Sequence, residues 1–215
     1  MDTLFAFGRD RSEIGRAAKI VLDLVGAAAM LVVLAPVFAV IAAVVALDGG
    51  PVLYAHRRVG TGGRRFGCLK FRSMVRDSDV ALHRLLAADP AAAAEWADRQ
   101  KLSRDPRVTA VGRFLRSTSL DELPQLINIL RLEMSFVGPR PIVEAEVPRY
   151  RDAIKYYYEA RPGLTGLWQV SGRSDTGYAE RVMLDTRYVQ TWSLGQDLRI
   201  LAQTVPAVLA RRGAV

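Results

Sequence analysis

The feature that most limits how this chain can fold is a run of 24 residues, 24–47, that carries no charged side chain and consists mostly of Ala, Val and Leu. A helix needs about 20 apolar residues to cross the hydrocarbon core of a bilayer, so the run is long enough to insert. The acidic residues Asp2, Asp10 and Glu13 before it, and its length, disfavour a secretory signal peptide. A small domain seldom encloses so long an uncharged helix. The sequence therefore predicts a membrane-inserted helix.

Basic residues lie on both sides of this run, at 9, 11, 16 and 19 before it and at 57, 58, 64, 65, 70 and 72 after it. The positive-inside rule assigns both flanks to the cytoplasm, which one straight span cannot satisfy. Pro36, at the middle of the run, removes a backbone hydrogen bond and bends a helix. We therefore expect a re-entrant helix, broken at Pro36, that returns to the face it entered. A kinked span with its C-terminal part in the cytoplasm is the alternative.

The rest of the chain predicts one compact α+β domain, mostly helical, attached to that membrane element. Short strands at 52–55 and 66–71 flank a Gly-rich turn at 60–63, which indicates a hairpin. Helical patterns cover 75–100 with a break near Pro90, then 123–132, 144–158, 178–192 and 196–212, whereas 135–141 and 161–173 are expected to be irregular. We divide the chain into an N-terminal basic interfacial segment (1–19), a membrane helix-break-helix (20–48) and a cytoplasmic catalytic domain (49–215).

The charge balance points to anionic partners. Lys and Arg outnumber Asp and Glu by 30 to 22, a net charge of +8, which suits nucleic acid, anionic lipid or phosphate-bearing substrates. The single cysteine, Cys68, excludes an intramolecular disulfide, and with two histidines it makes a His/Cys zinc site improbable. Any metal is therefore expected to be a hard cation held by carboxylates and phosphates.

Two adjacent carboxylates, Asp121 and Glu122, form the most informative part of the sequence. Pro124 has no N–H to donate and belongs in the first turn of the helix that follows, so the acidic pair lies at that helix's N-terminus. The simple interpretation is capping, by Asp121 or by a capping box of Ser119 and Glu122. The functional interpretation is that the pair holds Mg²⁺ or attacks phosphorus.

Arginines near turns and loops supply the partners that phosphate chemistry needs. A guanidinium suits bidentate phosphate contact, and one on a Pro-flanked loop such as Gly138 to Pro141 has a defined direction. An isolated surface arginine usually only solvates the surface, but five beside a carboxylate pair favour phosphoryl chemistry at a membrane. The five arginines are Arg113, Arg116, Arg140, Arg161 and Arg173.

Four motifs in this chain resemble those of the bacterial sugar transferases, the monotopic phosphoglycosyl transferases. The resemblance covers the chain from about residue 15 onward and is greatest to the short exopolysaccharide-type galactosyl-phosphate transferases. The motifs are KFRSM at 70–74, TSLDELPQ at 118–125, VGPRP at 137–141 and RPGLTGLWQVSGR at 161–173.

The resemblance implies an enzyme that transfers a hexose-1-phosphate from a UDP-sugar to undecaprenyl phosphate and releases UMP, which initiates exopolysaccharide assembly. Asp121 is the implied nucleophile, forming a covalent phosphosugar-aspartyl intermediate, and Glu122 is implied to orient Mg²⁺ or handle protons. Galactose and glucose are the favoured sugars. The residues implied to hold phosphates are Arg116 and Arg140, with Lys70 and Arg173 as weaker candidates.

The resemblance also implies a location and partners. The enzyme is expected at the cytoplasmic face of the cell inner membrane, in contact with membrane lipids, with a homodimer allowed. Two departures stand out: Ala35 precedes Pro36 where many relatives have Ser, and Ala145 stands where relatives often place a glutamate. Glu144 or Glu146 are the available substitutes, and both are left outside the catalytic set.

Two other classes are compatible with parts of the sequence. A non-catalytic membrane scaffold is disfavoured by the intact Asp121-Glu122 pair. A nucleic-acid-binding protein is supported by the basic charge alone, without a recognised motif, so we expect no nucleic acid partner.

Overall fold

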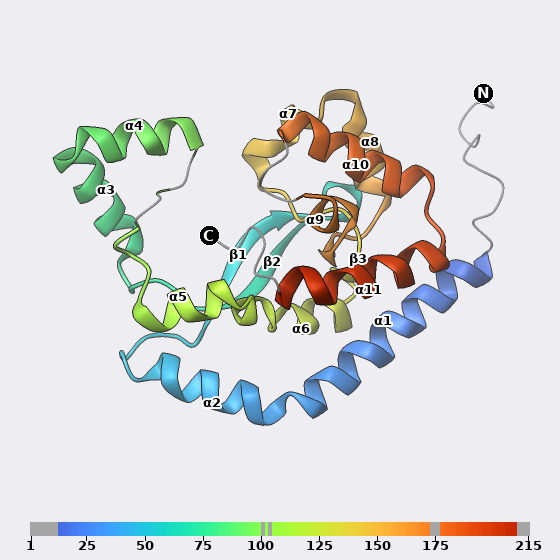
Figure 1. Ribbon diagram of the computed structural model, residues 1–215, viewed down its shortest axis with the longest axis horizontal. Coiled ribbons are helices and arrows are strands. Elements are labelled where there is room, and N and C mark those ends of the chain that lie inside the picture. The colour runs from blue at the N-terminus through green and yellow to red at the C-terminus, as the bar shows by residue number, and fades with distance from the viewer. Residues whose placement is uncertain (1–12, 100–101, 103–104, 173–176, 210–215) are drawn as a thin grey trace.

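The computed structural model describes residues 13–99, 102, 105–172 and 177–209, which form a mostly helical body around small sheets (Figure 1). The coarse expectation, a largely helical α+β chain, is confirmed. The α-helices are α1 (Glu13–Val33), α2 (Ala35–Ala46), α3 (Ser78–Ala88), α4 (Pro90–Arg99), α5 (Ala110–Ser117), α6 (Gln125–Leu130), α7 (Val147–Tyr150), α8 (Ile154–Glu159), α9 (Leu167–Val170), α10 (Tyr178–Gln190) and α11 (Leu194–Leu209). The strands are β1 (Leu53–Val59), β2 (Arg65–Phe71), β3 (Ser135–Val137) and β4 (Gly163–Thr165). Short 3-10 turns lie at Thr61–Gly63, Leu120–Glu122, Glu144–Glu146 and Arg151–Ala153.

The uncharged run lies in two helices, the C-terminal part of α1 and the whole of α2. The two helices meet at Leu34 at an angle of 64° and lie along one side of the body (Figure 1). Pro36 lies in the first turn of α2, where its missing N–H leaves the carbonyl of Val32 without the usual helical donor. The break therefore falls where the sequence predicts it. Among the described residues no single helix has the length and apolarity to span a bilayer, whereas the bent pair has both when taken together.

Buried ion pairs attach α1 to the rest of the molecule. Asp23, 3% exposed, accepts hydrogen bonds from Ser135 Oγ at 3.1 Å, Phe136 N at 3.0 Å and Arg161 Nη2 at 3.0 Å. One turn earlier, Lys19 Nζ lies 2.5 Å from Asp197 Oδ2 of α11. Because each charge is paired and hydrogen-bonded, the carboxylates of Asp23 and Asp197 can be buried between α1 and the body of the molecule. Helix α1 therefore has a fixed position relative to β3 and α11.

The predicted hairpin is confirmed, with strands longer than expected. β1 and β2 pair antiparallel from Leu53 opposite Phe71 to Val59 opposite Arg65. The connecting turn uses Gly62 (φ 64°) and Gly63 (φ 77°), a backbone conformation that glycine adopts without strain. Because side chains alternate between faces, one face of the hairpin carries Tyr54, His56 and Arg58 from β1 beside Phe66, Cys68 and Lys70 from β2.

Helix α6 packs against β2 and fixes the segment that carries the acidic pair. Leu126 and Ile129 are fully buried in one cluster with Cys68 of β2 and Ala27 of α1. Asn128, also fully buried, donates from Nδ2 to the Gly67 carbonyl at 2.8 Å and accepts from Leu69 N at 2.9 Å. Strand β2, helix α1 and helix α6 are thus packed against one another.

Two sequence expectations are wrong. Residues 135–141 and 161–173, expected to be irregular, contribute β3 and β4, which pair in parallel, and 167–170 form α9. The pairing depends on Gly163, whose backbone approaches Gly138 so closely that a Cβ would lie 2.1 Å from Gly138 N. The single helix expected over 144–158 is instead a series of short turns, interrupted at Arg151, where φ is 48°.

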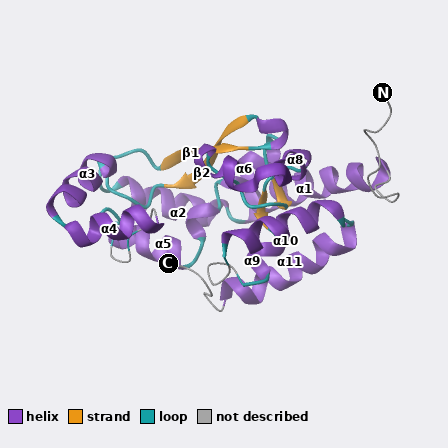
Figure 2. Cartoon of the chain, turned by 90° about the horizontal axis from the view of Figure 1, so that it is seen from above, coloured by secondary structure: helices purple, strands orange, loops and turns teal. Residues whose placement is uncertain are grey.

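Other helix predictions are confirmed. α3 and α4 meet at Pro90, as predicted, and project from the body on the opposite side of the view from the start of α1 (Figure 1). Seen from above, α9, α10 and α11 form a group on one side of the body, while the hairpin lies on the other (Figure 2). α10 and α11 cover most of the two ranges expected to be helical, 178–192 and 196–212.

Candidate active site

The acidic pair lies in a 3-10 turn, Leu120–Glu122, between α5 and α6. Ser119 enters this turn in the left-handed conformation (φ 57°, ψ 15°), which changes the chain direction before Asp121. No side-chain capping bond is made at Ser119 or at Pro124, the residue that directly precedes α6. The capping interpretation of Asp121 and Glu122 is therefore wrong, and their carboxylates are directed elsewhere.

Lys70 of β2 contacts both carboxylates. Its Nζ lies 2.7 Å from Glu122 Oε1 and 3.8 Å from Asp121 Oδ2. Asp121 is only 6% exposed. One ammonium group thus neutralises part of the charge of two adjacent acids, at the point where strand β2 passes the acidic turn.

The two acids differ in pKa. Burial raises the pKa of Asp121 above the ordinary aspartate value, with a contribution from the charge of Glu122, and Lys70 and Arg116 oppose this only in part. Burial acts in the same sense on Glu122, but the charges of Lys70 and Arg140 outweigh it, so the pKa of Glu122 lies below its usual range. The surroundings thus shift the pKa values of the two acids in opposite directions, upward for Asp121 and downward for Glu122.

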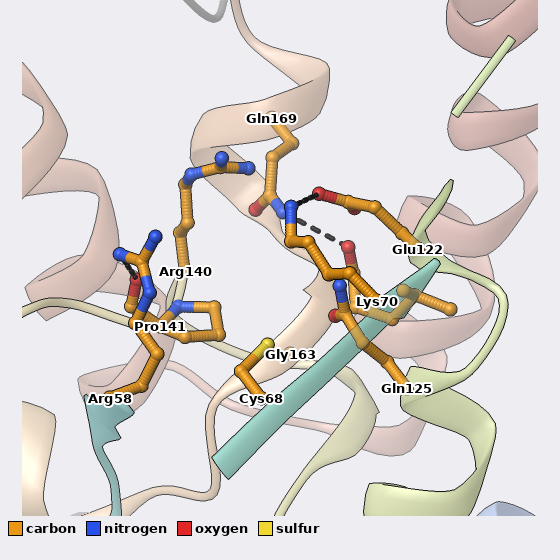
Figure 3. Close-up of a pocket in the computed structure, with 10 residues that line it drawn as sticks. Arg58, Cys68, Lys70, Glu122, Gln125, Arg140, Pro141, Gly163 and Gln169 are labelled. Atoms are coloured by element: carbon orange, nitrogen blue, oxygen red, sulfur yellow. Dashed lines mark hydrogen bonds and ion pairs between the residues drawn. The ribbon is translucent and has the colours of Figure 1, made fainter. Parts of the chain in front are cut away.

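Three cationic side chains and two amides border the pocket above Glu122 (Figure 3). Arg58 and Arg140 lie on one side and Lys70 on the other, with the Gln169 side chain between them in the view. The cavity itself holds only about 10 Å³, roughly the room of one water. The lining residues are Arg58, Cys68, Lys70, Glu122, Gln125, Arg140, Pro141, Gly163, Leu164 and Gln169.

The loop that carries Arg140 is held on several sides. Arg181 of α10 donates from Nη2 to the Arg140 carbonyl at 3.3 Å, and Arg58 donates from Nη1 to the Pro141 carbonyl at 3.1 Å. The guanidinium of Arg140 lies 5.9 Å from the centre of the Trp168 ring. Within the described part of the chain, Arg140 forms no ion pair, because no carboxylate oxygen lies within 4.0 Å of its guanidinium nitrogens. This cation is thus fixed in position and available to an anion.

Arg116 lies in the last turn of α5, just before the acidic turn, and is not among the residues that line the pocket. Its Nε donates to Ser73 Oγ at 2.8 Å, and its charge lowers the pKa of Asp121. The contact depends on Gly112, where α5 crosses the backbone of Ser73. A Cβ on residue 112 would lie 1.9 Å from the Ser73 carbonyl oxygen.

We predict that Gly112→Ala lowers the free energy of unfolding by about 1–3 kcal/mol or more, because the added methyl forces α5 away from Ser73. The measurement is the thermal midpoint of the detergent-solubilised chain. Gly195→Ala is the matched control, since that exposed glycine near the start of α11 has nothing within 4 Å of its Cβ position. Equal midpoints for the two variants would contradict the close approach of α5 to Ser73.

The remaining expected residues do not gather at the pocket. Arg161 pairs with Asp23 of α1, and Arg113 donates from Nη1 to the Val108 carbonyl at 3.1 Å, so both serve the fold. Glu144 pairs with Arg65 at 2.9 Å, and Glu146 with Arg181 at 3.0 Å, away from the acidic pair. Arg173 lies outside the described residues.

Arg58, Gln125 and Gln169 line the pocket although sequence reasoning did not assign them to it. Gln125 and Gln169 are within the quoted motifs, and Arg58 entered only as a charge flanking the membrane run. The sequence did hold a signal for Arg58. Side chains alternate between the two faces of a strand, so once the hairpin turn is placed at 60–63, Arg58 and Lys70 fall on the same face.

The acidic pair fits a hard cation only with help from a ligand. Among the described residues, no group of three or more His, Cys, Asp or Glu side chains could hold a metal. Mg²⁺ is commonly bound by one or two carboxylates together with substrate phosphates and water. Asp121 and Glu122 supply such a carboxylate set, and the cationic residues around them suit the phosphates.

A carboxylate pair beside an ammonium group, next to an arginine-lined pocket, is a surrounding that suits phosphoryl chemistry. The sequence places it in a family: residues 14–211 match the sequence model for bacterial sugar transferases. The chain belongs to the bacterial sugar transferase family, as its motifs indicate.

Several curated relatives are similar over nearly the whole chain. The UDP-galactose-lipid carrier transferase of Erwinia amylovora is 52% identical over 93% of this chain and 42% of its own length. The exopolysaccharide production protein ExoY of Rhizobium meliloti is 52% identical over 94% of this chain and 89% of its own. The UDP-glucose:undecaprenyl-phosphate glucose-1-phosphate transferase of Caulobacter vibrioides is 43% identical over 91% and 71%. The chain thus spans less than half of the Erwinia relative and most of the Rhizobium relative.

Proposed function

We propose that this protein transfers a hexose-1-phosphate from a UDP-sugar to undecaprenyl phosphate, releasing UMP, as a first step of exopolysaccharide assembly. The names of the relatives support this class of reaction and favour galactose or glucose as the sugar. The observation that carries the proposal is the contact of Lys70 with both Asp121 and Glu122, at a pocket that Lys70 and Glu122 line together with Arg58 and Arg140. An anionic diphosphate and a carboxylate nucleophile both need such a cationic surrounding.

The proposed reaction has two steps. A carboxylate oxygen of Asp121 attacks the phosphorus that carries the sugar, and the bond from that phosphorus to the bridging oxygen of the diphosphate breaks, so that UMP leaves with the bond's electron pair. The aspartyl phosphosugar is then attacked by a phosphate oxygen of the lipid acceptor, and the aspartyl–phosphorus bond breaks to regenerate Asp121. Partial desolvation of Asp121 favours the first step, because a buried carboxylate is less stabilised by water.

Each basic residue has a role in this scheme. Lys70 holds the two carboxylates in position, and Arg140 and Arg116 stabilise the charge on the transferring phosphoryl group. Glu122, with its lowered pKa, is an ionised ligand for a cation or an acceptor for a proton. Mg²⁺, bound by Asp121, Glu122 and substrate phosphates, supplies neutralisation of the negative charge on the phosphates.

We also propose that the bent pair α1–α2 is re-entrant and places the pocket at the cytoplasmic face of the cell inner membrane. The large apolar side chains of this pair that are exposed support contact with lipid, since water would surround them otherwise. They are Ile14, Ile20, Val21, Leu22, Val25, Met30, Val32, Val33, Val37, Val40, Val44 and Leu47. The expected homodimer stays a prediction.

The test of this function is UMP release from a panel of UDP-sugars by the full chain in detergent, with Mg²⁺ and undecaprenyl phosphate. We expect release with UDP-galactose or UDP-glucose, dependent on both Mg²⁺ and the acceptor for repeated turnover. A folded protein that releases UMP from no donor in the panel, with or without acceptor, would count against the transferase. As a control for the metal, EDTA should abolish UMP release and added Mg²⁺ should restore it.

A further inference from the structure

A second hollow adjoins the active-site pocket along the edge of β1. It holds about 370 Å³, within the roughly 300–1,000 Å³ usual for small-molecule sites. Arg58 lines both spaces and therefore links them. We call this hollow the β1 groove; its lining residues are His56, Arg57, Arg58, Val59, Arg65, Val143, Glu144 and Ala145.

The β1 groove is positively charged. Its lining holds three arginines and one glutamate. Arg65 pairs with Glu144 at 2.9 Å. Arg58 Nη1 lies 3.8 Å from Glu146 Oε2, whereas Arg57 has no carboxylate at ion-pair distance among the described residues. Of the five N–H groups of Arg58, one donates to the Pro141 carbonyl and another contacts His56 Nδ1 at 3.0 Å. The arginine is therefore already oriented by protein contacts and has further N–H groups for an anion between the two spaces.

His56 offers a flat, neutral surface in this groove. Burial and the charge of Arg58 lower the pKa of His56 to about 4, so the ring is uncharged near neutral pH. Since a guanidinium can only donate, Nδ1 of His56 accepts from Arg58 and the ring proton lies on Nε2. The Tyr54 ring is 5.9 Å away, centre to centre, on the same face of the hairpin. Such a ring can stack on a planar group and donate one hydrogen bond.

The sizes of the two spaces require the donor to extend beyond the pocket. The space of about 10 Å³ beside Glu122 has no room for a nucleoside, so the nucleoside of a bound donor must lie outside this pocket. We propose that the β1 groove binds the nucleoside monophosphate part of the donor, with Arg58 and Arg57 at its phosphate and His56 against its base or ribose. This inference rests on the proposed function, because it names where that donor lies.

The experiment measures UMP binding to the full chain in detergent by equilibrium dialysis, for wild type, His56→Ala, Arg57→Gln and the control Arg64→Gln. Arg64 is exposed in the same hairpin and does not line the groove. We expect the Kd for UMP to rise about tenfold in His56→Ala, from the lost stacking, and about threefold in Arg57→Gln, an exposed charge. Arg64→Gln should leave it unchanged. The KM for the UDP-sugar should rise by the same factors, with no change in the KM for undecaprenyl phosphate.

Three results would overturn the inference. Wild-type binding of UMP with equal Kd in all variants would remove the nucleotide from the groove while leaving the proposed function intact. A rise in the KM for undecaprenyl phosphate alone would assign the groove to the acceptor's phosphate. Absence of binding of UMP and of every UDP-sugar to wild type would reject the donor class, and the proposed function with it. The thermal midpoint of each variant is compared with that of wild type. If His56→Ala is unstable, Arg57→Gln still tests the inference, because Arg57 is exposed and its replacement leaves the core unchanged.

Discussion

Replacing Asp121 by Asn is expected to reduce UMP release by more than about 10⁴-fold, the scale of loss when a covalent nucleophile is removed. The amide has nearly the same shape, so it fits the same buried position, where Asp121 is 6% exposed. It carries no negative charge and forms no acyl phosphate that the acceptor could discharge. The measurement is initial UMP release at saturating UDP-sugar, Mg²⁺ and undecaprenyl phosphate.

A second readout separates a nucleophile from a residue that merely holds substrate. Incubating wild type with a donor labelled in the sugar, without acceptor, is expected to label the protein itself, and later addition of undecaprenyl phosphate should remove the label. Asp121→Asn should acquire none. Asp152→Asn, an exposed aspartate in the turn before α8, is the matched control and should behave as wild type. Protein labelling that persists in Asp121→Asn would assign the nucleophile to another side chain.

The sequence was sufficient to predict the break in the N-terminal helix pair and the hairpin. Charges on both flanks of the run and Pro36 within it predict a break, and the chain bends by 64° at Leu34, two residues earlier. The glycines at 62 and 63 predict a tight turn, and both adopt positive φ. In each case the determinant is local, since it depends on the intrinsic geometry of one or two residues.

The sequence was insufficient for β3 and β4. A three-residue strand carries no measurable periodicity, and these two are separated by the whole of 138–162. Their pairing depends on contacts distant in sequence: Gly163 against Gly138, and Asp23 of α1 against Ser135 and Phe136. Tertiary packing therefore determines the strand conformation of segments that local sequence preference predicts to be loops.

The candidate site was predictable in its acids and only partly in its cations. Glu122, Lys70 and Arg140 were expected and line one pocket, and Asp121, also expected, lies beside it, 3.8 Å from Lys70. Arg161 was one of the five arginines taken to favour phosphoryl chemistry, but it pairs with Asp23 of α1. An aspartate at the start of an apolar run needs a buried counter-charge, and the sequence alone does not say which of several arginines provides it.

Replacing Lys70 tests whether the acidic pair needs the ammonium group beside it for catalysis. We expect Lys70→Met to lower the rate of UMP release by roughly 10²–10³-fold, because a fixed positive charge is lost beside the reacting carboxylate. Met has similar length and fills the same space. Lys155→Met, an exposed lysine of α8, is the matched control and should retain full activity.

The pH profile of this variant identifies the group on which Lys70 acts. Asp121 attacks in its ionised form, so activity falls as the pH drops through its pKa, which burial already raises above the ordinary aspartate value. Lys70 lowers that pKa, and its removal raises it further, so the acid limb of the rate profile should move to higher pH in Lys70→Met. The pKa of Glu122 should rise as well, because Lys70 also holds it low. A slower enzyme whose acid limb stays in place would mean that Lys70 serves substrate binding and not the ionisation of Asp121, whereas a limb that moves to lower pH would contradict the electrostatics of the pair.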